Sequence, residues 1–173
     1  MRSLAFWQTV TADRAGLLED FVQLLREEEI RFCVVGGQAV NAYVEPVVSL
    51  DLDLAVAADQ LERLTRLLEG RFRVERFPHS VNISVAGSDV RIQLQTDPRY
   101  ADFVDGAETR DVLGLTLPVA KVEDVLQGKI WAAADSSRRA SKRQKDLADI
   151  ARILEAHPDL RSLVPQDILE RLF

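Results

Sequence analysis

The sequence predicts an α+β fold: a mixed β-sheet flanked by helices, followed by a C-terminal helical tail. Three observations lead to this class. Helical and extended patterns alternate up to residue 70, three strand-like segments follow between residues 72 and 95, and the chain is helical from about residue 122 onward. We expect residues 1–120 to form an α/β core and residues 121–173 a helical extension packed on it, in a single compact unit.

The helices are indicated by apolar residues that recur every three or four positions. In the first helix this pattern runs through Leu17, Phe21 and Leu25, and Thr11 or Asp13 is suited to cap its start. The expected helices are residues 12–28, 38–44, 59–69, 122–134 and 140–155, with a short final helix after Pro165.

The strands are indicated by short apolar or alternating segments. The apolar run 32–35 ends at Gly36-Gly37 and is typical of a buried strand. Residues 49–56 alternate, with leucines on one face and Asp51 and Asp53 on the other. The remaining expected strands are residues 72–77, 81–85 and 90–95, the last two joined as a hairpin through Gly87-Ser88, and one more at residues 115–117 within the ambiguous segment 106–118.

Composition excludes several classes of protein. With 47% hydrophobic and 29% charged residues, the chain is neither a disordered tail nor a low-complexity linker. No apolar run approaches the roughly 18 residues that span a membrane. A single cysteine, Cys33, allows no internal disulfide and favours a cytoplasmic location. The net charge of −6 argues against a globally basic nucleic-acid-binding surface but leaves room for a local basic patch.

Two neighbouring motifs carry the chemistry. Gly36 and Gly37, between a strand and a helix, would let the backbone approach an anion such as phosphate. Asp51 and Asp53 project from one face of a strand, about 6–7 Å apart at Cα, which suits divalent cations with oxygen ligands. A triphosphate on the glycines could then be bridged by Mg²⁺ to the two carboxylates. Each motif alone is common in proteins without such a site, but aspartates are rare in strands, and the combination favours function.

The residues Val35-Gly36-Gly37, then Ala39, a short helix and a strand bearing Asp51 and Asp53, resemble the signature of the nucleotidyltransferase superfamily with the DNA polymerase β-type fold. Minimal nucleotidyltransferases and the AbiEii-like toxins of bacterial toxin–antitoxin pairs are the most similar groups, over about residues 31–154. The resemblance implies a nucleotidyltransferase-like sheet. It also implies that the glycines hold the triphosphate of a nucleotide and that the acidic pair binds Mg²⁺ or Mn²⁺.

The sequence departs from that family in two places. The family often has Arg-x-Thr ahead of the acidic pair, whereas this chain has Val47-Val48-Ser49. Active members usually carry a third carboxylate on a later strand, where this chain has Gln93 between Arg91 and Gln95. Asp89 or Asp97, at the ends of that strand, could substitute. Otherwise Gln93 completes the catalytic set as a neutral ligand, and two cations are held less well.

A second candidate region lies in the helical tail. Residues 136–145 contain five basic side chains and no acid, a composition that attracts phosphates. The pattern Lys142-x-x-Lys145-Asp146-x-x-Asp149 is similar to a segment of AbiEii-like proteins, which implies that Lys142 and Lys145 contact phosphates or the acceptor, with Asp146 in support. Lys129 is a further candidate. The alternative is a solvated helix face with a Lys142–Asp146 pair.

Three interpretations of function remain open. The first is an enzyme that transfers a nucleotidyl group from a nucleoside triphosphate to an acceptor hydroxyl or phosphate. If the chain is AbiEii-like, RNA is a candidate acceptor and an antitoxin a candidate protein partner. The second is a catalytically degenerate nucleotide-binding or regulatory module on the same fold, and the third is a plain interaction domain. His79 and His157, next to prolines, are expected at the surface, and Cys33 in the core.

Overall fold

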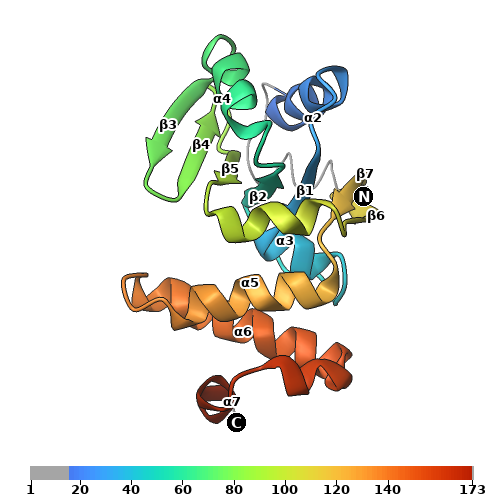
Figure 1. Ribbon diagram of the computed structural model, residues 1–173, viewed down its shortest axis with the longest axis vertical. Coiled ribbons are helices and arrows are strands. Elements are labelled where there is room, and N and C mark those ends of the chain that lie inside the picture. Colours follow the sequence, from blue (N-terminus) through green and yellow to red (C-terminus); the bar gives the residue numbers. More distant parts are fainter. Residues whose placement is uncertain (1–15, 173) are drawn as a thin grey trace.

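The computed structural model describes residues 16–172, which form a seven-stranded mixed sheet with helices on both sides (Figure 1). The predicted α+β class is confirmed. The strand order is β3-β4-β5-β2-β1-β7-β6. The strands are β1 (Phe32–Val35), β2 (Asp51–Val56), β3 (Arg73–Phe77), β4 (Ser80–Ser84), β5 (Arg91–Gln95), β6 (Glu108–Val112) and β7 (Leu115–Val119).

The helices follow the predicted apolar periodicity closely. They are α2 (Leu17–Glu27), α3 (Gly36–Asn41), α4 (Leu61–Glu69), α5 (Val122–Ala134), α6 (Ala140–Ala156) and α7 (Gln166–Leu172), with 3₁₀ segments η1 (Pro98–Val104) and η2 (Pro158–Leu163). The expected cap at Thr11 or Asp13 lies outside the described residues. Within residues 16–172, no helix combines the length and the apolar character needed to cross a membrane.

One boundary differs in a way that matters for the site. We predicted a helix from residue 38, with the two glycines as a loop, but α3 begins at Gly36 itself. Gly36 has a φ of +65°, in the left-handed region, and turns the chain directly from β1 into the helix. The diglycine is therefore the first turn of α3.

The central strands bring the two predicted motifs together. β2 pairs antiparallel with β1 and parallel with β5, so it lies between the diglycine strand and the strand that carries Gln93. Leu52 and Leu54 are fully buried in the core, and Asp51 and Asp53 alternate with them on the partly exposed face. In Figure 1, α2 and α4 lie on one side of these strands and α3, α5 and α6 on the other.

Besides the antiparallel pair β3–β4, two hairpins complete the sheet. β4 and β5 are antiparallel neighbours, which confirms the hairpin predicted around Gly87. The ambiguous segment forms a second hairpin, β6–β7, whose turn residues Leu113 and Gly114 both have positive φ, as a tight hairpin turn requires. β7 then pairs parallel with β1 and leads into α5.

Candidate functional site

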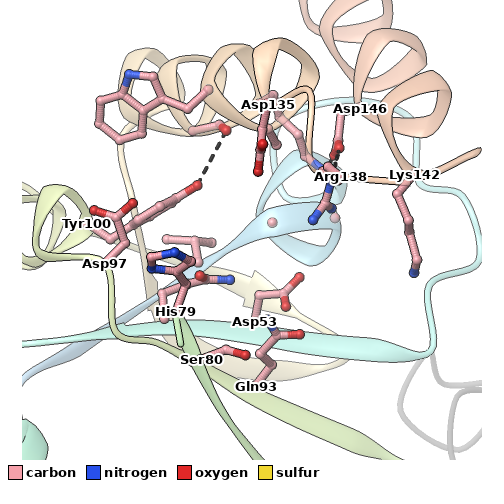
Figure 2. A pocket seen from close by; sticks show the side chains of 18 of the residues that line it. Asp53, His79, Ser80, Gln93, Asp97, Tyr100, Asp135, Arg138, Lys142 and Asp146 are labelled. Carbon is pink, nitrogen blue, oxygen red and sulfur yellow. Dashed lines mark hydrogen bonds and ion pairs between the residues drawn. The ribbon is translucent and has the colours of Figure 1, made fainter. Parts of the chain in front are cut away.

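A cavity of about 960 Å³ lies between the sheet, η1 and the helices α5 and α6. All seven residues that the sequence nominated line it: Gly36, Gly37, Asp51, Asp53, Gln93, Lys142 and Lys145. They come from four elements, α3, β2, β5 and α6, spread over more than half of the chain. Figure 2 shows the acidic strand facing the basic end of α6 across this space.

The diglycine lies directly against the acidic strand. A Cβ atom at Gly36 would sit 2.8 Å from Cγ of Asp53, so only glycine fits between β1 and this carboxylate. A Cβ at Gly37 would lie 3.1 Å from Oγ of Ser49 and 4.0 Å from Nζ of Lys145. Gly37 and Lys145 both line the cavity, so a ligand that contacts this part of the backbone would also lie close to the ammonium of Lys145.

Asp53 occupies the centre of this arrangement. It is opposite Val35 of β1 on one side and Gln93 of β5 on the other. Burial raises the pKa of its carboxyl to about 6; the nearby charge of Lys129 opposes this rise in pKa, and that of Asp51 adds to it. The protein thus holds a carboxylate where its charge is poorly solvated, a common property of ligand-binding acids.

Asp51 lies nearer the cavity mouth, with 30% of its side chain exposed. Its Oδ2 is 4.0 Å from Nζ of Lys142, and its Oδ1 is 3.5 Å from Nε of Arg91. Neither distance is a hydrogen bond, and Oδ1 is a buried atom with no hydrogen-bond partner among the described residues. This oxygen is available for a ligand.

Gln93, which we predicted at the position of a third carboxylate, lies in register with Asp53. The two aspartates that could substitute for a third carboxylate are placed differently from each other. Asp89 is exposed and does not line the cavity. Asp97 lines it but pairs with Arg99 at 2.6 Å and accepts a hydrogen bond from the Arg99 backbone N–H, which lowers the pKa of Asp97. Within residues 16–172, no group of three or more Asp, Glu, His or Cys side chains is placed to hold a metal.

The tail residues are arranged differently from the surface pair that we considered. Lys129 is 93% buried, and its ammonium lies 2.7 Å from Asp149 and 3.1 Å from Asp146. Burial lowers the pKa of Lys129, but the two carboxylates outweigh burial and raise it overall. Asp146 is therefore not the partner of Lys142, because packing of α5 on α6 places Lys129 against it. Lys142 extends toward Asp51 instead.

Several cavity residues had not been singled out from the sequence. Tyr100 and Phe103 of η1 and Trp131 of α5 form an aromatic wall, with ring centroids 5.2–5.8 Å apart. The 3₁₀ segment has no periodic pattern to reveal it. Arg138 lay within the predicted basic region without being distinguished from its neighbours. His79, expected at the surface, is exposed and also lines the cavity, from the β3–β4 turn.

The sequence matches the model of one protein family, described as nucleotidyl transferase AbiEii toxin, type IV toxin–antitoxin system, over residues 18–173. The chain belongs to this family. The predicted resemblance is thereby confirmed for most of the chain. No functionally curated protein matches the chain in sequence.

Solved structures show the same fold at low sequence identity. The antibiotic-resistance factor ANT(2'')-Ia superposes with a TM-score of 0.57 and 15% identity, covering 92% of this chain and 96% of that one. The lincosamide antibiotic adenylyltransferase LnuA gives 0.54 and 12%, covering 83% and 99%. An antigenic nucleotidyltransferase-like protein from Paracoccidioides brasiliensis gives 0.51 and 20%, covering 86% and 75%. The AbiEii-family chain thus has a nucleotidyltransferase fold.

Proposed function

We propose that this chain binds a nucleoside triphosphate with a divalent cation and transfers the nucleotidyl group to an acceptor hydroxyl or phosphate. In that reaction an acceptor oxygen bonds to the α-phosphorus, the bond from that phosphorus to the bridging oxygen breaks, and pyrophosphate leaves. The observation that carries the proposal is the single cavity in which Asp51 and Asp53 face the diglycine and the lysines of α6.

The acidic pair fits a bound Mg²⁺ or Mn²⁺. Asp51 offers a buried oxygen without a hydrogen-bond partner, and Asp53 is a poorly solvated carboxylate beside it. Gln93, in register with Asp53, can add a neutral amide oxygen, so the donor set is the hard oxygen type that these cations prefer. A bound cation would neutralise charge on the phosphates and on the departing pyrophosphate.

The chain's own residues would bind and orient the triphosphate. Gly37 and Lys145 line the cavity close to each other, so a phosphate group at this point would contact both. Lys142, now 4.0 Å from Asp51, is placed to exchange this carboxylate for a phosphate oxygen. Positive charges in a recessed site also raise the local concentration of an anionic substrate.

Release of pyrophosphate tests this proposal. The wild type is incubated with each of the four nucleoside triphosphates, Mg²⁺ and either an RNA pool or small hydroxyl compounds as acceptors. We expect release that is abolished in the Asp51→Ala/Asp53→Ala double variant. Asp59 and Asp105, exposed partners of Arg31, supply a matched control: their double alanine variant should retain activity. Equal release from wild type and the Asp51/Asp53 variant would refute the catalytic role.

The alternative is a module that binds nucleotide without turnover, and the observation that favours it is the neutral Gln93 at the third position. Calorimetric titration with ATP and GTP separates the two. Binding together with pyrophosphate release supports the enzyme, whereas binding without release in every acceptor mixture supports the module.

We also propose that the biological role is that of a toxin, with RNA as acceptor and an antitoxin as partner. The support is the description of the family to which the chain belongs. Induced expression in bacteria should arrest growth, and the Asp51→Ala/Asp53→Ala variant should not. Growth arrest by both proteins would separate toxicity from nucleotidyl transfer.

A further inference from the structure

In the described part of the chain, the guanidinium group of Arg138 uses only one of its three nitrogens to bind the protein. It lies at the start of the helical tail's basic region, just before α6, and its side chain is 40% exposed and lines the cavity. Its Nε donates a 2.8 Å hydrogen bond to Oδ2 of Asp146. The two terminal nitrogens have no hydrogen-bond partner among residues 16–172. In Figure 2 the guanidinium extends from this contact into the cavity, above Asp53.

Asp146 is itself fixed. Only 2% of the residue is exposed, and its other oxygen, Oδ1, accepts a hydrogen bond from the buried Lys129 at 3.1 Å. Lys129 also pairs with Asp149, which in turn binds Arg152 at 2.8 Å. A carboxylate held this tightly restricts the orientation of any side chain that depends on it.

The positive charge of Arg138 acts on Asp53. Together with Lys129 and Lys145, it favours the ionised form of Asp53 by electrostatic attraction. Arg138, just before α6, thus extends the row of cations on that helix: Lys145 lies beside Gly37, Lys142 beside Asp51, and Arg138 over Asp53.

We infer that Arg138 binds phosphoryl oxygens of the nucleotide through its two terminal nitrogens and that Asp146 is the positioning residue that orients it. This inference rests on the proposed nucleotide-binding function. Arginine suits the task because its planar fork bonds a carboxylate through Nε while two further donors meet phosphate oxygens. A lysine has a single ammonium and cannot hold both partners in the same way.

Calorimetric titration with inorganic tripolyphosphate and with ATP, both in Mg²⁺, tests the inference without requiring turnover. We expect Arg138→Gln to weaken binding of both ligands by about 10–100-fold, the usual effect of losing a charge-assisted pair. Arg139→Gln is the matched control, because Arg139 is the adjacent, exposed arginine and does not line the cavity; its affinity should equal that of wild type. Wild-type affinity in Arg138→Gln would overturn the inference and leave the proposed function standing. Absence of binding by the wild type would overturn both.

The positioning role has its own test. Arg138→Lys keeps the positive charge but not the planar fork of donors. Of the affinity that Arg138→Gln loses relative to wild type, Arg138→Lys should therefore restore less than a tenth. Wild-type affinity in Arg138→Lys would overturn the role of Asp146. Asp146→Asn should weaken tripolyphosphate binding, and adding Arg138→Gln should then cost little more, because the two residues act as one unit. If the losses of affinity in the two single variants add up in the double variant, Asp146 does not act through Arg138. If Asp146→Asn lacks the wild-type circular dichroism spectrum, the Arg138→Lys result decides.

Discussion

Asp53, the proposed metal ligand, also affects the stability of the protein. Its carboxyl has a pKa of about 6, above its ordinary value of 3.8, because burial disfavours the charge. The unfolded chain therefore releases this proton at lower pH than the folded one. Ionisation of Asp53 does not change the free energy of unfolding below about pH 4. It lowers this free energy increasingly between pH 4 and 6, and by a constant amount of at most about 3 kcal/mol above pH 6.

We therefore expect Asp53→Asn to stabilise the metal-free protein at pH 8 and to have little effect near pH 4. Urea unfolding in EDTA at both pH values measures the difference. Asp59→Asn, at an exposed aspartate, should show no such pH dependence. If Asp53→Asn and the wild type have the same free energy of unfolding at pH 8, the buried charge does not destabilise the protein.

Gly36 combines two constraints, a positive φ and contact with Asp53. Gly36→Ala should destabilise the protein by more than the strain of the backbone alone, which is about 1 kcal/mol. Gly16 provides the matched control, since it has the same φ of +65° but no atom of residues 16–172 within 4 Å of where Cβ would lie. Thermal unfolding of the two alanine variants isolates the contact; equal losses of stability would show that Asp53 moves aside freely.

Cys33 is fully buried in β1, and burial raises the pKa of its thiol to about 12. Because the thiolate is the reactive form, the native protein should not react with Ellman's reagent at pH 8 over several hours. In urea one thiol per chain should react within minutes. Rapid reaction of the native protein would place Cys33 at an accessible site.

At the scale of elements, ion pairs join α5 to α6, and hydrogen bonds of Arg152 join α6 to α3. Lys129 of α5 pairs with Asp146 and Asp149 of α6, and Arg152 of α6 binds Asn41 of α3 at 3.0 Å. Arg152 also donates to the carbonyl of Glu45 at 2.6 Å, in the loop that leads toward β2. The helix that carries the phosphate-binding candidates is thus held to the helix that begins with the diglycine.

Lys129→Met should destabilise the protein by about 3–5 kcal/mol, because it leaves two buried carboxylates without their shared partner. Lys142→Met, which removes a half-exposed lysine from the same region, should change stability by less than about 1 kcal/mol. Urea unfolding at pH 7 compares them. Similar stabilities of the two variants would contradict a structural role for the buried lysine.

Most of these elements could be predicted from the sequence, because a long apolar pattern marks the face that an element buries in the core. Residues 122–134 form α5 as predicted, and β1 has the predicted bounds. The sequence did not predict η1, which has no repeating pattern, or the partner of Asp146. A helical wheel shows only neighbours on one helix, whereas Lys129 comes from another.

At the scale of the whole molecule, the strand order determines which residues meet in the candidate site. Placing β2 between β1 and β5 brings Asp53 into register with both the diglycine strand and Gln93. Each motif could be predicted from local sequence, and their proximity followed from the resemblance to a known family. The aromatic wall and the orientation of Arg138 depend on how α5 and α6 pack over the sheet, which no local pattern encodes.

The distribution of charge over the molecule also depends on how the helices pack over the sheet. The chain is acidic overall, at −6, yet α6 and the segment just before it bring Arg138, Lys142 and Lys145 to one cavity. A basic cluster on an acidic protein directs anions to one place rather than coating the surface.

The most direct measurement is a crystal structure of the protein soaked with Mn²⁺ and a non-hydrolysable nucleoside triphosphate. We expect an anomalous Mn²⁺ peak in contact with Asp51 and Asp53, and phosphate density running over Gly36 and Gly37 toward Lys142 and Lys145. A triphosphate bound elsewhere, or a cavity that stays empty at saturating ligand, would contradict the central claim that these residues form one nucleotide site.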